Sequence, residues 1–109
     1  MMTERQAQSE FSQMVARLLL KAKEMGYEVT LGEAWRPAWV AEEYAKQGKG
    51  SRNSFHIRRL AIDINLFKDD EWLNKTEDHR QLGEWWETIG GTWGGRFKRP
   101  DGNHYSYLE

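Results

Sequence analysis

The chain offers three histidines and no cysteine, so a transition-metal site would have to use imidazole nitrogens and carboxylate oxygens. His56 precedes the clearest strand pattern of the sequence, Asp63 lies inside that pattern, and His104 opens another. Two imidazoles and one carboxylate form a ligand set that zinc accepts, leaving a fourth position for water. These three residues are therefore the candidate metal ligands. For Asp63 taken alone, an outward-facing, solvated position on a one-sided sheet is the alternative.

Two further side chains could complete a hydrolytic site. Asp101 lies three residues before His104 in a tight turn and could act as a general base, although Pro-Asp-Gly is also ordinary turn chemistry. Arg36 could hold a substrate carboxylate or a developing oxyanion. Its alternative is a surface arginine stacked on the neighbouring Trp35. His79 lies in a polar run, and we expect it to be solvated and not a ligand.

Hydrophobic periodicity predicts the elements that must position these residues. They are, in order, a helix over residues 11–25 ended by Gly26, a short strand over 27–31, a helix from Pro37 to Ala45, a strand over 60–66, a helix from after Thr76 to Ile89, and a last strand over 104–108 after a hairpin. This order predicts an α+β fold with about three helices and a small, mainly antiparallel sheet. We expect one domain over residues 1–109.

The charge balance and the distribution of apolar residues argue against some classes of binding partner. Sixteen basic and seventeen acidic side chains give a net charge of −1, which argues against nucleic-acid binding. No apolar run is long enough to span a bilayer, and residues 1–6 lack the pattern of a secretory signal. We therefore expect a protein that binds neither nucleic acid nor membrane and is made in the cytoplasm. We also expect it to be a monomer.

Three segments together resemble a known family. Ser54–Asp63 resembles the Ser-x-His-(six residues)-Asp signature of VanY-type D,L-carboxypeptidases. These belong with the zinc peptidases that include lysostaphin, D-alanyl-D-alanine dipeptidases and the hedgehog fold. Asp101–His104 resembles the family's acid-x-x-His element, and Glu33–Arg36 resembles the segment that carries its arginine. The resemblance covers about residues 30–107.

The resemblance implies a role for each matching position. It implies that Asp101 is the catalytic base, that Arg36 polarises the substrate and that Ser54 supports the first ligand. The implied zinc ligands are His56, Asp63 and His104.

The resemblance also suggests a branch of the family. An aspartate base and the Arg-Leu-Ala-Ile-Asp version of the motif are similar to phage endolysins that cut the L-alanyl-D-glutamate bond of peptidoglycan. We accordingly expect a zinc endopeptidase that is made in the host bacterial cytoplasm and released to the bacterial wall by a holin. The alternatives are a D-alanyl-D-alanine carboxypeptidase and a catalytically silent, zinc-bearing module that binds the wall.

Overall fold

The structure, a computed structural model, describes residues 1–109, and its first helix is α1 (Glu4–Glu24). Thr3 begins this helix with a reciprocal cap: its hydroxyl accepts from the Gln6 amide at 3.1 Å, and the Gln6 side chain accepts from the Thr3 amide at 2.9 Å. Gly26, at a φ of 91°, ends it as predicted. The apolar stripe of α1 is buried and consists of Ala7, Phe11, Met14, Leu18 and Ala22.

The sheet is antiparallel throughout. Its strands are β1 (Glu28–Leu31), β2 (Ala61–Lys68), β3 (Glu71–Leu73), β4 (Thr92–Trp93) and β5 (His104–Ser106). They lie in the order β1-β2-β5-β4, and β3 pairs with the distal end of β2. Strand β2 is therefore central, and the side chains of Ile62, Ile64 and Leu66 bury one of its faces in the core. The other face of β2 is free to carry polar groups.

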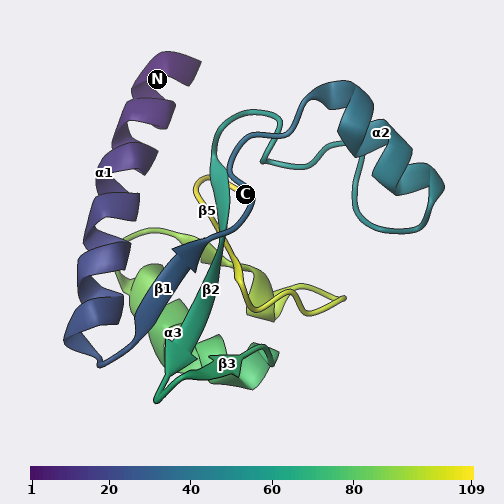
Figure 1. The fold of residues 1–109 in the computed structure, drawn as a ribbon. Helices are drawn as coiled ribbons and strands as arrows, with labels where there is room; N and C mark the ends of the chain where they lie inside the picture. Colours follow the sequence, from purple (N-terminus) through teal and green to yellow (C-terminus); the bar gives the residue numbers. More distant parts are fainter.

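The helices are distributed unequally around this sheet. Helix α3 (Arg80–Thr88) packs beside α1 on the core, whereas α2 (Ala38–Lys46) extends away from the body on the far side of β2 (Figure 1). Two short 3-10 turns, Thr76–His79 and Gly94–Arg96, precede α3 and follow β4. The predicted α+β fold with three helices and a small antiparallel sheet is thus confirmed. None of the helices has the length and apolar character required to cross a membrane.

The structure also contains elements that the sequence pattern did not reveal. Strands β3 and β4 are three and two residues long, too short to show an alternation. The β2–β3 hairpin turns at Asp69 and Asp70, whose φ values of 51° and 63° are left-handed. The last strand ends at Ser106, before the predicted Leu108, which has a φ of 67° and cannot continue an extended strand.

His79 is buried, contrary to the expectation that it is solvated. Only 2% of the residue is exposed, and its Nδ1 lies 2.8 Å from the hydroxyl of Tyr105, also in the core. The polar run around it forms the 3-10 turn that leads into α3, so a single residue of the run points inward. Burial lowers the pKa of His79 to about 4, although the charge of Asp78 acts in the opposite direction.

This burial predicts a loss of stability in acid. The pKa of His79 is about 4 in the folded chain against 6.5 ordinarily, so the unfolded chain binds the extra proton between these values. The free energy of unfolding should therefore fall as the pH drops from about 6.5 to 4, by about 3 kcal/mol in total. Urea titrations with chelator at pH 7 and 4.5 should show a smaller pH dependence for His79→Gln, which keeps a partner for Tyr105. Equal pH dependence in both proteins would contradict the assignment.

Candidate metal centre and its cleft

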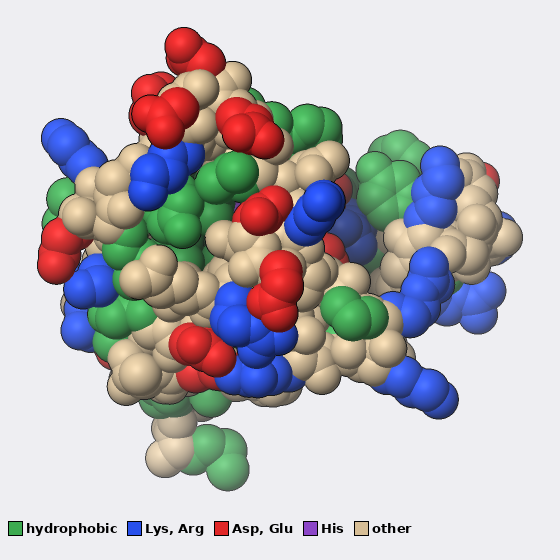
Figure 2. Space-filling model, turned by 90° about the horizontal axis from the view of Figure 1, so that it is seen from below, with side chains coloured by type: hydrophobic (Ala, Val, Ile, Leu, Met, Phe, Trp, Pro, Cys, Tyr) green, Lys and Arg blue, Asp and Glu red, His purple; other side chains and the backbone are tan.

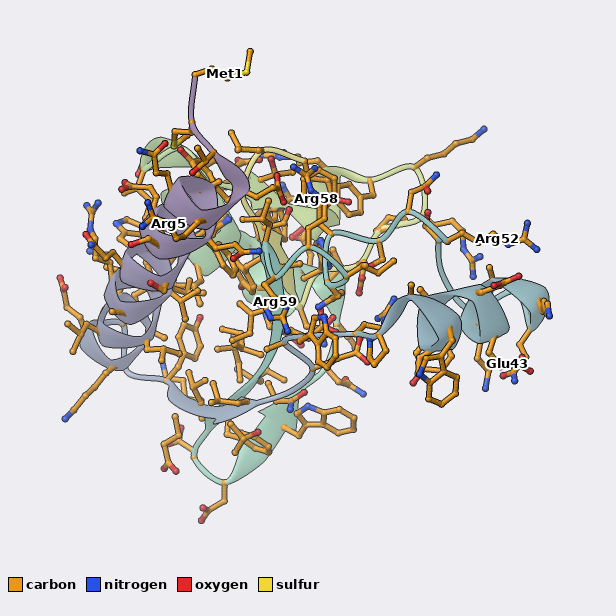
Figure 3. The ribbon with its side chains drawn as sticks, turned by 90° about the horizontal axis from the view of Figure 1, so that it is seen from above. Met1, Arg5, Glu43, Arg52, Arg58 and Arg59 are labelled. Carbon is orange, nitrogen blue, oxygen red and sulfur yellow. The ribbon has the colours of Figure 1, made fainter.

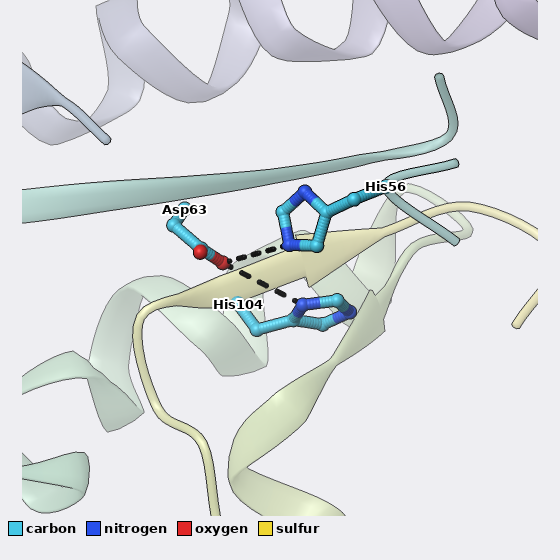
Figure 4. A group of neighbouring side chains, drawn as sticks. All are labelled: His56, Asp63 and His104. Carbon is cyan, nitrogen blue, oxygen red and sulfur yellow. Dashed lines mark hydrogen bonds and ion pairs between the residues drawn. The ribbon is translucent and has the colours of Figure 1, made fainter. Parts of the chain in front are cut away.

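The register of the sheet brings Asp63 and His104 together. They are directly opposite each other in the β2–β5 ladder, so their side chains emerge on the same face, away from the core. His56 reaches this face from the turn that precedes β2, where its amide donates to the Ser54 hydroxyl at 3.2 Å. Figure 4 shows both imidazoles directed at the Asp63 carboxylate. Residues 41 positions apart in the chain thus meet because two strands pair.

The three side chains have the spacing of a metal-ligand set. One carboxylate oxygen of Asp63, Oδ1, lies 3.2 Å from His56 Nε2 and 3.6 Å from His104 Nδ1. All three ligand atoms lie within 4.8 Å of one another. Ligand atoms at about 2.0–2.2 Å from a tetrahedral zinc ion would be about 3.3–3.6 Å apart. The residues present therefore fit a zinc ion in number and type, and the two distances to Asp63 are close to the spacing that zinc requires.

The outer nitrogen of each imidazole is already engaged. His56 Nδ1 lies 2.9 Å from the carbonyl oxygen of Ala34, and His104 Nε2 lies 2.7 Å from Oε1 of Glu109. A carbonyl and a carboxylate can only accept, so each outer nitrogen carries the hydrogen and donates it. In a neutral imidazole the inner nitrogen then presents a lone pair to Asp63. Lone pairs that face a carboxylate need a cation between them, and this is how histidines are oriented around metals.

The charges around the three side chains also favour a cation at the centre. Burial alone would raise the pKa of Asp63, but hydrogen bonds from His104 and His56 outweigh it and lower the pKa to about 2. Burial alone would lower the pKa of His104, but its bonds to Asp63 and Glu109 raise it to about 9. The pair of carboxylates thus stabilises positive charge among the rings, supplied either by protons or by a metal ion.

Asp101 lies at the edge of this centre. Its Oδ2 is 4.0 Å from His104 Nδ1, and its side chain is 54% exposed. The turn that carries it packs so tightly on Gly94 that a Cβ there would lie 2.3 Å from the Asp101 carbonyl oxygen. Burial and the charge of Asp63 raise the pKa of Asp101, which makes it a better proton acceptor than an ordinary aspartate.

Arg36 is held in place by the segment that follows β1. Its amide donates to the His56 carbonyl at 3.2 Å, and its Nε donates to Oε1 of Glu33 at 2.7 Å, with Nη2 on the same oxygen. Its guanidinium lies 5.0 Å from the centre of the Tyr44 ring. Only 11% of the side chain is exposed, so the alternative of a surface arginine is wrong. Nη1 donates to no protein group and remains available to a ligand.

A cleft of about 1020 Å³ opens over the metal centre, and several of the residues that the sequence predicts for the site line it. Arg36, Asp101, His104 and Ser54 line it, whereas His56 and Asp63 contact His104 or its partner carboxylate but do not line the cleft. Sequence reasoning missed Glu109, which lines the same cleft and orients His104. It also missed the Ala34 carbonyl, because a backbone acceptor leaves no trace in side-chain chemistry.

Comparison with known proteins gives a family and a fold. The family model described as D-alanyl-D-alanine carboxypeptidase matches residues 47–107, more than half of the chain. Among solved structures, the chain is similar to the L-Ala D-Glu endopeptidase ChiX of Serratia marcescens, with a TM-score of 0.71 and 18% identity over 89% of this chain and 79% of that one. A search of curated proteins found no significant match. The resemblance to VanY-type peptidases is thereby confirmed.

The geometry predicts that Glu109 strengthens metal binding. Glu109→Ala removes the acceptor that orients His104, and we expect zinc affinity to fall about 10- to 100-fold. Glu109→Gln should lose less, because its amide oxygen still accepts from Nε2. Glu10→Ala, on the exposed face of α1, should bind zinc like the unaltered protein. Affinity is measured by competition with a chromophoric chelator. Equal affinity for Glu109→Ala and the unaltered protein would show that the backbone alone holds His104.

Proposed function

The chain belongs to the D-alanyl-D-alanine carboxypeptidase family of peptidases, and from this we propose that it is a zinc-dependent peptidase that hydrolyses the peptide stems of bacterial peptidoglycan. The single observation that carries the proposal is the convergence of three ligand atoms whose imidazoles are already oriented by Ala34 and Glu109. A purely structural site would have no use for Asp101 and Arg36 in the same cleft.

The proposed ligands are His56, Asp63 and His104. Zinc bound there would polarise the substrate carbonyl and lower the pKa of a bound water molecule to about 7. Zinc is preferred to magnesium or calcium because two of the three ligand atoms are imidazole nitrogens. The side chains that surround the ligands supply the remaining chemistry.

Asp101 is the proposed general base. It would take a proton from the attacking water while the water oxygen bonds to the amide carbon. It would then deliver that proton to the amide nitrogen as the carbon–nitrogen bond breaks, which regenerates the carboxylate. Arg36 would donate from Nη1 to the oxygen of the scissile carbonyl, with Glu33 fixing the plane of its guanidinium.

The bond that we propose is the L-alanyl-D-glutamate bond. The structural neighbour from Serratia marcescens is an L-Ala D-Glu endopeptidase, and the base is an aspartate. The second candidate is D-alanyl-D-alanine carboxypeptidase activity, which the family's own description favours. The biological role that we propose is that of a phage endolysin, a single-domain monomer released to the wall by a holin.

Digestion of purified Gram-negative peptidoglycan, analysed by mass spectrometry, tests this proposal. Stems cut between L-alanine and D-glutamate, with cleavage lost on chelation and restored by zinc, are the expected products. Release of terminal D-alanine alone would favour the carboxypeptidase. No cleavage of several wall types by zinc-loaded protein would favour a silent wall-binding module.

The roles of the site residues are separable by mutation. Asp101→Asn should keep zinc affinity but lower kcat about 10²- to 10⁴-fold, because only the proton transfer is lost. His56→Ala and Asp63→Ala should instead weaken zinc binding. Asp70→Asn, an identical change in the exposed β2–β3 turn, is the matched control and should leave both quantities unchanged. Cleavage by Asp101→Asn at the unaltered rate would show that another group is the base.

A further inference from the structure

Basic side chains border the cleft over the metal centre on two sides. Lys49 lies on the loop after α2, and Lys98 and Arg99 lie on the loop between β4 and β5. Figure 2 shows Lys and Arg side chains gathered along the side of the molecule that carries α2. The chain as a whole has a net charge of −1, so this local excess of positive charge does not follow from composition.

None of these three cations forms an ion pair within the protein. No carboxylate lies within 4.0 Å of Lys49, Lys98 or Arg99, whereas Arg36 deeper in the cleft is paired with Glu33. Arg99 donates one hydrogen bond, from Nη1 to the carbonyl oxygen of Gly48 at 3.3 Å. That bond joins the two loops, so the three charges border one opening.

A second hollow meets the cleft at Asp101 and has a different character. It measures about 220 Å³ and is lined by neutral polar groups that include Asn65, Thr76 and Asn103. His79 also lines it and is uncharged at neutral pH, since its pKa is about 4. No lysine or arginine borders this hollow. An anionic group beside Asp101 would therefore be stabilised in the cleft and not in the smaller hollow.

Resting on the proposed function, we propose that Lys49, Lys98 and Arg99 form a subsite for the free carboxylate of the residue whose amine leaves. Asp101 delivers a proton to that amine, so the leaving residue must lie beside it. In an L-alanyl-D-glutamate bond, and equally in a D-alanyl-D-alanine bond, the nitrogen-side residue carries a free α-carboxylate next to the scissile amide. The subsite therefore selects stems in which this group is a carboxylate and rejects those in which it is a carboxamide.

The test compares two stem peptides that differ only in this group, D-glutamate against D-isoglutamine after L-alanine. The unaltered enzyme should show a kcat/KM about tenfold or more higher for the acid, with the preference declining as salt is added. Lys49→Gln/Lys98→Gln/Arg99→Gln should lose the preference by losing rate on the acid alone. Arg5→Gln/Arg17→Gln/Lys23→Gln changes the net charge equally but on α1, on the opposite side of the molecule from α2 (Figure 3). None of these three residues lines the cleft, so this variant should keep the preference.

The outcomes separate this proposal from the proposed function. Equal hydrolysis of acid and amide by the unaltered enzyme would overturn the subsite and leave the peptidase in place. If digestion identifies the D-alanyl-D-alanine bond, the same acid–amide comparison is made on that dipeptide. If neither peptide is cleaved, the proposed function fails, and the dissociation constants of both peptides for the zinc-loaded protein decide the subsite. Tighter binding of the acid, lost in the cleft variant but not in the α1 variant, would support it, and equal binding would overturn it.

Discussion

The organisation of this molecule depends on one constraint: a single carboxylate oxygen of Asp63 faces two imidazoles whose outer hydrogens are already donated elsewhere. Neutral rings held in this way repel the carboxylate, so the arrangement is stable only with positive charge at its centre. The pKa of His104 is raised and the pKa of Asp63 is lowered, and both shifts favour positive charge on the rings beside a negative carboxylate. The fold must therefore hold these three groups within reach of one another.

The segment between β1 and α2 meets most of this requirement through its backbone. The Asp63 amide donates to the Glu33 carbonyl at 2.8 Å, and the Ala34 carbonyl accepts from His56. Gly32 permits the close approach, since a Cβ there would lie 2.9 Å from the Asp63 carbonyl oxygen. The same few residues then hold Arg36 through the Glu33 side chain. One extended stretch thus fixes a ligand strand, orients a ligand ring and positions a cation.

These relations explain what the sequence could and could not predict. The alternation in β2 places Asp63 opposite the core side, and the motif around His104 marks its counterpart, so the sequence predicts which residues converge. The roles of those residues stay predictions. The positions of Glu109 and of the Ala34 carbonyl depend on tertiary contacts that have no local pattern. The sequence predicts a solvated His79 because its neighbours are polar, and only its contact with Tyr105 shows that it points inward.

The carboxylates around the cleft also affect the approach of an anionic substrate. Asp63, Asp101 and Glu109 surround the same space, and their combined field would repel a substrate that carries a carboxylate. Burial and the negative charge of Asp63 raise the pKa of Asp101, whereas the charges of His104, His56 and Arg36 act in the opposite direction. A cation at the centre would reduce that repulsion and hold Asp101 deprotonated, as a base requires. Basic groups at the cleft border would attract the anionic substrate without lying between the ligands. The cations that attract the substrate would then be distinct from the cation at the centre.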